Sequence, residues 1–114
     1  FSQRHYLHYE QERPVQWTTG AYLWIRRSVL DELDGWDGEI FMYGEDADLC
    51  YRSSRAGYPV LYAPSSTAFH YHNKTPIDRT WRKRLLREGL TLYVKKHYGA
   101  LRYQLYRLVF AIFW

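Results

Sequence analysis

The chain contains one cysteine, Cys50, among its 114 residues. A single thiol excludes an internal disulfide and favours a reducing compartment. We expect Cys50 to be a small core residue rather than a nucleophile. The first residues have no initiator methionine and no charged segment followed by an apolar one, which a secretory signal requires. We therefore expect a fragment of a longer protein that works in the cytoplasm.

Long apolar runs are also scarce. The longest one closes the chain, where residues 109–114 read VFAIFW. A helix over residues 100–114 would be only about 22 Å long, which is short of the roughly 30 Å hydrocarbon core of a membrane. This segment predicts an interfacial amphipathic helix or the start of a membrane segment, and a helix packed on the core explains it equally well.

Basic side chains are absent from residues 31–48, where eight acids gather. From Arg79 onward the chain has nine bases and one acid, so that part carries a charge of +8. Because the whole chain carries +4, the first 78 residues carry −4, and the two parts have different electrostatic roles. Aromatic residues reach 19%, a share that suits cores, interfaces and sugar-stacking surfaces.

Hydrophobic periodicity predicts an α/β fold of short elements. The predicted strands cover residues 15–26, 58–63 and 67–72. The predicted helices are a short one capped by Ser28 and ended by Gly35, one over residues 45–56 ended by Gly57, a long one capped by Asp78 or Thr80 and ended by Gly99, and the tail. Gly20 lies inside the first predicted strand, where a glycine often marks a bulge or the close approach of a ligand.

An acidic group opens the helix predicted at residues 45–56. Glu45, Asp46 and Asp48 would face the positive end of its dipole. Helical steps from Asp46 lead to Leu49 and Cys50, so the Asp46 carboxylate would lie at the mouth of a core. A solvated helix cap is the simpler interpretation of such a group.

His70 and His72 would project from one face at the end of a predicted strand. In open α/β sheets, the ends of strands are where site residues gather. Taken alone, His70 can also be explained as a core histidine and Trp36 as loop packing.

Several motifs follow one another in an order that resembles a known family. They are Gly20 and Ala21, Arg26 and Arg27, Trp36 and Asp37, the run from Gly44 to Leu49, the turn from Ala56 to Tyr58, His70, and the run from Lys96 to Gly99. Over about residues 14–99 the chain resembles the C-terminal half of the catalytic domain of family-two glycosyltransferases, especially the rhamnosyltransferase-like branch.

The resemblance implies a GT-A fold with a short mixed sheet flanked by helices. Residues 1–76 would form the acceptor and catalytic half of that domain, and residues 77–114 a basic amphipathic helical extension. Enzymes of this family transfer a sugar with inversion from a nucleotide-diphosphate donor to an acceptor hydroxyl, here in polysaccharide or cell-envelope glycan synthesis.

The resemblance also assigns roles to single residues. Asp46, with Glu45 beside it, would take the proton of the acceptor hydroxyl. His70 and His72 would be metal ligands for a divalent ion, Mn²⁺ or Mg²⁺, which is expected only together with the family's Asp-x-Asp motif in a preceding nucleotide-binding half. The acceptor contacts would be Gly20, Ala21, Trp36 and Asp37. Three positions depart from the family's pattern on the acceptor side, namely Asp34, Trp36 and Gly38.

The expected partners are a nucleotide-sugar donor and a glycan or lipid-linked acceptor. A membrane surface is a further candidate partner through residues 80–114, which would place the protein at the inner face of the membrane; nucleic acid is not favoured. We expect the isolated chain to have no transferase activity and to expose a sheet edge that permits self-association.

Two other function classes stay open. A non-enzymatic basic module could bind nucleic acid or an anionic membrane surface through residues 80–107, whose eight bases, preceded by Arg79, are interleaved with aromatic rings. Salt-sensitive binding to generic nucleic acid without any effect of Asp46→Asn would favour it. A zinc site would need a set of ligands from His5, His8, His70, His72 or Cys50, whose spacing matches no closed zinc site.

Overall fold

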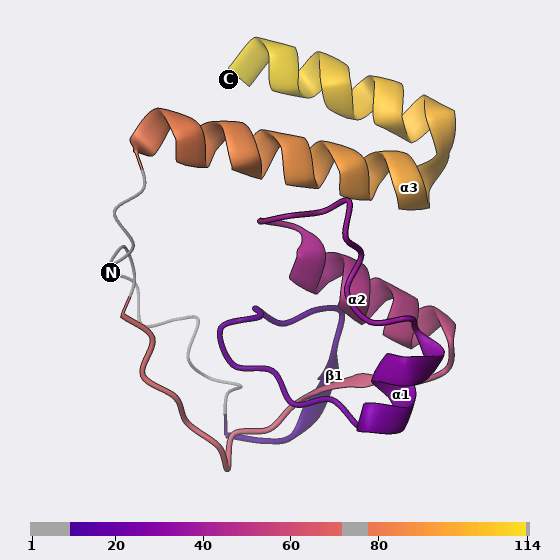
Figure 1. The fold of residues 1–114 in the computed structure, drawn as a ribbon, viewed down its shortest axis with the longest axis vertical. Helices are drawn as coiled ribbons and strands as arrows, with labels where there is room; N and C mark the ends of the chain where they lie inside the picture. Colours follow the sequence, from indigo (N-terminus) through magenta and orange to yellow (C-terminus); the bar gives the residue numbers. More distant parts are fainter. Residues whose placement is uncertain (1–9, 72–77, 114) are drawn as a thin grey trace.

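The computed structural model describes residues 10–71 and 78–113. It contains strand β1 (Arg13–Val15), helices α1 (Arg27–Glu32) and α2 (Glu45–Arg55), strand β2 (Val60–Tyr62) and helix α3 (Arg79–Phe113). The strands and α1 lie at one end, α2 lies in the middle, and α3 covers the other end (Figure 1). The described part of the chain is therefore a small α/β unit, as its periodicity predicts.

The sheet is smaller than expected. β1 pairs with β2 antiparallel, with Arg13 opposite Tyr62 and Val15 opposite Val60, so the described sheet is antiparallel and two-stranded rather than mixed. The predicted strand at residues 15–26 is wrong beyond Val15, and residues 67–71 of the strand predicted at 67–72 are not extended in a sheet. A strand requires a partner for its backbone hydrogen bonds. Residues 17–26 instead cross the apolar side of α2, where Leu23 and Ile25 line one pocket with Leu49.

Helix α2 forms as predicted. Its first turn holds three acids and its last turn holds two arginines, which matches both ends of the helix dipole. Gly44 precedes it with φ +109° and Gly57 follows it with φ +90°. Residues other than glycine rarely adopt these backbone conformations. The apolar face of α2 buries Leu49 and Cys50. Cys50 is thus the core residue expected from the sequence, and burial raises the pKa of its thiol.

Helix α1 starts two residues earlier than predicted, at Arg27 instead of Val29. Arg26 is the last extended residue, and Ser28 lies inside the helix, so the prediction that Ser28 caps it is wrong. Arg27 pairs with Asp31 one turn later, which favours helical geometry from Arg27 onward. Gly35 ends the element as predicted, with φ +71° and its N–H donating to the Leu30 carbonyl at 2.9 Å.

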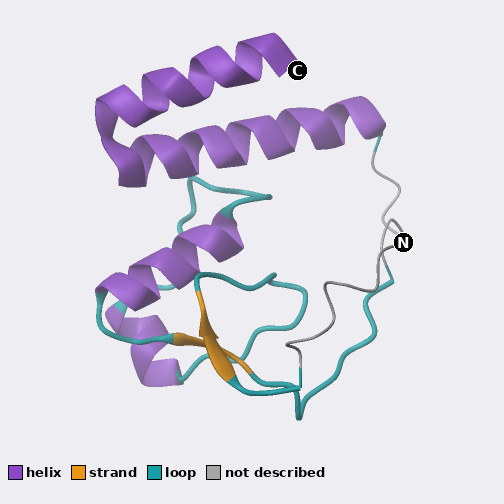
Figure 2. Ribbon diagram, turned by 180° about the vertical axis from the view of Figure 1, so that it is seen from behind, coloured by secondary structure: helices purple, strands orange, loops and turns teal. Residues whose placement is uncertain are grey.

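Helix α3 is two helices joined at Gly99, where φ is 75° and ψ is 171°. Asp78 caps the first part, because its carboxylate accepts hydrogen bonds from the N–H groups of Thr80 and Trp81 at 2.8 and 3.0 Å. The two parts run antiparallel, and residues 100–113 form the outermost layer (Figures 1 and 2). Within residues 10–71 and 78–113, no helix is both long enough and apolar enough to cross a bilayer.

Candidate functional site

Asp46 lies in the first turn of α2 and is held by the segment that contains Gly20. The Asp46 carboxylate accepts a hydrogen bond from the Gly20 N–H at 3.1 Å and one from the Ala47 N–H at 2.8 Å. A Cβ atom at Gly20 would lie 3.6 Å from the Asp46 Cβ and 3.8 Å from the Trp36 ring. The structure thus brings together three residues that are predicted for the site from different parts of the sequence.

Glu45 differs from Asp46 in its surroundings. Its Oε2 atom is buried and has no hydrogen-bond partner among the described residues. Burial raises the pKa of Glu45, and the neighbouring charge of Asp46 raises it further. Glu45 therefore holds a proton to higher pH than an ordinary glutamate does.

The loop that enters α2 is fixed by close contact with α3. Tyr43 has a positive φ of 65°, and Gly44 follows with a positive φ as well. A Cβ atom at Gly89 of α3 would lie only 1.8 Å from the Tyr43 carbonyl oxygen and 2.6 Å from the Met42 carbonyl oxygen. Only glycine allows this approach of a helix to a loop backbone. Gly89 thus sets the position of the residues immediately before Glu45 and Asp46.

A cleft of about 900 Å³ opens between the start of α2, the Gly20 segment and the first part of α3. Five residues predicted for the site line it: Gly20, Ala21, Glu45, Asp46 and His70. The α3 wall is apolar and aromatic, with Leu86, Leu90, Tyr93 and Tyr98. The Asp46 carboxylate and the His70 imidazole therefore share one cleft. His72 lies outside the described residues.

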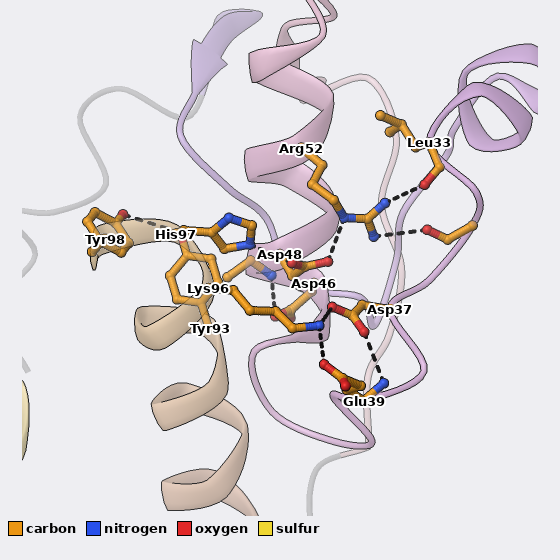
Figure 3. Close-up of polar contacts among 12 residues, drawn as sticks. Leu33, Asp37, Glu39, Asp46, Asp48, Arg52, Tyr93, Lys96, His97 and Tyr98 are labelled. Carbon is orange, nitrogen blue, oxygen red and sulfur yellow. Dashed lines mark hydrogen bonds and ion pairs between the residues drawn. The ribbon is translucent and has the colours of Figure 1, made fainter. Parts of the chain in front are cut away.

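Trp36 and Asp37 are not among the residues that line this cleft. Trp36 is 48% exposed and lies beside Gly20. Asp37 forms an ion pair with Lys96 of α3, which lowers the pKa of the Asp37 carboxyl, and it also accepts a hydrogen bond from the Glu39 N–H at 3.0 Å. Lys96 contacts Glu39 at 2.5 Å as well (Figure 3). This loop is therefore anchored to α3, and its role as an acceptor contact stays a prediction.

Asp48 is fully buried and joins three segments of the chain. Its carboxylate lies 2.6 Å from the His97 Nε2 of α3 and accepts a hydrogen bond from the Arg52 Nε at 2.8 Å (Figure 3). The same guanidinium donates to the carbonyl oxygens of Leu33 at 2.7 Å and Gly35 at 2.9 Å. Asp48 is thus a structural link between α2, α3 and the turn after α1.

Tyrosine rings surround His97 on the α3 side of the cleft. The centroid of the Tyr51 ring lies 4.4 Å from that of His97, and Tyr93 lies 5.2 Å from it. The hydroxyls of Tyr93 and Tyr98 are 3.3 Å apart. Burial raises the pKa of Tyr93, and its contact with Tyr98 adds to the effect, so its hydroxyl stays protonated at neutral pH. Rings with hydroxyl groups suit contact with a sugar.

Sequence reasoning did not single out Gly89 or the link between Asp48 and His97. Both have a signal that could have been used. Gly89 and His97 lie on the helical stripe of Leu86, Leu90 and Tyr93, where a glycine interrupts an otherwise strong helix. Asp48 and Arg52 have the spacing of a helical ion pair.

The part of the chain that the structure describes does not contain a complete set of metal ligands. Nowhere in residues 10–71 and 78–113 do three histidine, cysteine or acidic side chains come together as a metal site. His70 and Asp46 line the same cleft, but two such side chains do not complete a site for a divalent ion.

Comparisons with known proteins agree with these motifs. The family model described as "Glycosyltransferase like family 2" matches residues 3–91. The chain is 43% identical over 60 residues to an N-acetylglucosaminyl-diphospho-decaprenol L-rhamnosyltransferase of Mycobacterium tuberculosis, a match that covers 53% of this chain and 20% of the relative. It is 42% identical over 57 residues to the rhamnosyltransferase WbbL of Escherichia coli K12, covering 50% of this chain and 22% of that protein.

No solved structure matches significantly. The matched segment is about one fifth of the length of the curated relatives. The family model covers most of this chain, and the residues that it matches include the cleft residues from Gly20 to Leu90. The chain therefore belongs to glycosyltransferase-like family 2.

Proposed function

We propose that the protein containing this chain transfers a sugar from a nucleotide-diphosphate donor to an acceptor hydroxyl in glycan synthesis, with inversion. One observation carries the proposal: Asp46 lies at the start of α2 in a large cleft together with Glu45 and His70, in a chain of a glycosyltransferase family. The names of the relatives favour a rhamnosyl donor and, for the mycobacterial protein, a lipid-linked acceptor. We extend both to this chain as part of the proposal.

The proposed base is Asp46. An inverting displacement needs one base within hydrogen-bond reach of the acceptor hydroxyl, opposite the leaving diphosphate. Two backbone N–H groups hold the Asp46 carboxylate, one on each oxygen, so its orientation is fixed while further lone pairs stay available.

The proposed acceptor side is the aromatic part of the cleft lining, which α2 and α3 supply together. Tyr51, Tyr93 and Tyr98 present rings and hydroxyls there, beside the apolar side chains of Leu86 and Leu90. Such a surface can stack on a sugar ring and donate hydrogen bonds to it. We propose that this chain supplies the acceptor side and the base of a GT-A domain, while the nucleotide and a divalent ion, Mn²⁺ or Mg²⁺, are held mainly by residues outside it. His70 is this chain's proposed ligand to that ion.

The basic-module alternative receives less support from the structure. Its aromatic rings would have to be available for stacking on bases, but Tyr93, Tyr103 and Tyr106 are half-buried. It also gives no reason for the carboxylates in the cleft. A nucleic-acid function is therefore not proposed.

A transfer assay tests the proposal. The enzyme that carries this chain would be incubated with labelled nucleotide sugars and a lipid-linked N-acetylglucosaminyl diphosphate, and the products separated from the donor. We expect transfer from one deoxyhexose donor, with an anomeric configuration opposite to that of the donor. If folded enzyme forms no product from any of the donors, the proposal is contradicted.

A further inference from the structure

The second part of α3 exposes an apolar stripe. Leu101 is 76% exposed, Leu105 54%, Leu108 63% and Val109 55%. Their spacing of four, three and one residues places them on one face of the helix. We call this set the outer stripe.

The opposite face of the same helix packs inward. Tyr106 and Phe110 line a cavity of about 780 Å³ together with Arg87, Thr91 and Leu92 of the first part of α3, and the exposed Arg107 lies at the edge between this cavity and the outer stripe. The outer stripe therefore points away from the rest of the described protein, in the outermost layer of Figures 1 and 2. The inner face differs from the outer stripe, because Tyr106 and Phe110 on it are half-buried.

Positive charge borders the outer stripe. Arg102 lies one residue after Leu101 and Arg107 one residue before Leu108, each with its guanidinium 5.8 Å from a tyrosine ring centroid. Over its whole length α3 has nine basic residues and one acid, Glu88, which is paired with Arg84. An apolar helix face flanked by arginines is the pattern of helices that lie in a membrane interface.

The charges also indicate whether a second copy of the chain or a lipid surface binds the outer stripe. A second copy of this chain, packed stripe to stripe, would bring two strongly positive helices together. The acids of the same chain are largely engaged elsewhere: Asp37 and Glu39 with Lys96, Asp48 with Arg52 and His97, and Asp46 with Gly20. An anionic lipid surface supplies both the apolar layer for the stripe and the phosphates for the arginines.

We propose that the outer stripe is a membrane-docking face, which inserts Leu101, Leu105 and Leu108 into the acyl boundary of an anionic bilayer while Arg102 and Arg107 contact lipid phosphates. The helix lies along the surface and does not cross it. The long arginine side chains allow this, because their charged ends reach the headgroups while their stems stay beside apolar neighbours. This inference does not depend on sugar transfer.

Sedimentation with lipid vesicles tests it on the purified chain. Vesicles of phosphatidylcholine alone would be compared with vesicles that contain about one third phosphatidylglycerol. We expect binding to the anionic vesicles that weakens as salt rises, and at least about tenfold weaker binding for Leu105→Glu/Leu108→Glu. The matched control is Trp24→Glu/Phe69→Glu, which changes two side chains that are 82% and 89% exposed and lie outside α3. It should bind like the unchanged chain.

Circular dichroism would show that each variant keeps its helices. Equal binding by the stripe variant and the control variant would overturn the proposal, as would no binding of the folded chain to anionic vesicles. Analytical ultracentrifugation tests whether a second copy of the chain binds the outer stripe instead. If the chain forms a dimer that Leu105→Glu/Leu108→Glu abolishes, and does not bind vesicles, the outer stripe is a dimer interface and the membrane proposal is overturned.

Discussion

Two neighbouring carboxylates at the start of α2 have different surroundings. Asp46 accepts two backbone hydrogen bonds, whereas Glu45 has a buried oxygen without a partner among the described residues. Burying a charged oxygen without a hydrogen bond disfavours the charged form. The helix start therefore combines one well-held carboxylate with one that retains its proton more readily.

This difference predicts how Glu45→Gln changes stability with pH. The pKa of Glu45 is raised in the folded state above its ordinary value of 4.5, so the folded chain binds the proton more tightly and stability falls as pH rises above that value. The glutamine side chain of the variant cannot ionise. The variant should equal the unchanged protein near pH 3.5 and be more stable at pH 7, by no more than about 1 kcal/mol because Glu45 is partly solvated.

Urea denaturation at both pH values measures this difference. Asp34→Asn is a suitable control, because Asp34 is exposed and asparagine tolerates its positive φ. A stability gain from Glu45→Gln that is the same at pH 3.5 and pH 7 would show that ionisation of Glu45 is not its cause.

At the scale of elements, the contact between α3 and the loop before α2 depends on Gly89. Alanine favours a helix by about 1 kcal/mol over glycine, but its Cβ would lie 1.8 Å from the Tyr43 carbonyl oxygen. We expect Gly89→Ala to lower the free energy of unfolding by about 1–3 kcal/mol, because the overlap must be relieved by moving a backbone. Gly38→Ala is the matched control, since nothing lies within 4 Å of a Cβ there. Chemical denaturation compares the two, and a stabilised Gly89→Ala would refute the close contact.

The link between α2 and α3 through Asp48 and His97 can be measured with a double-mutant cycle. Asp48 is fully buried and His97 has a side chain only 14% exposed, so their interaction is shielded from water. For Asp48→Ala and His97→Ala we expect a coupling energy of about 1–3 kcal/mol.

The exposed pair of Arg27 and Asp31 provides the comparison, with side chains 85% and 57% exposed. Its coupling energy should be about 0.3–0.5 kcal/mol. Equal coupling in the two cycles would mean that the buried pair adds nothing beyond a surface ion pair, contrary to the role assigned to Asp48.

Helices were predictable from this sequence and most strands were not. α2 has an acidic first turn that includes Asp46 and ends before Gly57, and the first part of α3 is capped by Asp78 and ends at Gly99. These signals are local, because each one affects only the nearest helical turn. The alternation of residues 17–25 resembles a strand, but whether such a segment pairs depends on a partner elsewhere in the chain. Here this segment packs against the apolar face of α2 instead of pairing with a second strand.

For the whole molecule, the charge difference along the sequence becomes a set of contacts. The acidic residues 31–48 and the basic α3 meet where Lys96 contacts Asp37 and Glu39, and where His97 contacts Asp48. The sequence showed the two opposite charges but not this pairing, because it joins residues about fifty positions apart. The resemblance pointed to Asp46 and His70, which line one cleft, but the contact of Gly89 with the loop before α2 and the pairing of His97 with Asp48 were not predicted. The division at residues 76 and 77 stays a prediction.

The central claim is that Asp46 takes the proton of the acceptor hydroxyl. The most direct test is the single-turnover rate of sugar transfer by the enzyme that carries this chain, with both substrates saturating, for Asp46→Asn and for Asp34→Asn. We predict a loss of about 10²- to 10⁴-fold for Asp46→Asn, with acceptor affinity kept, and an unchanged rate for Asp34→Asn. A rate for Asp46→Asn within about threefold of the unchanged enzyme would contradict a role of Asp46 as the general base.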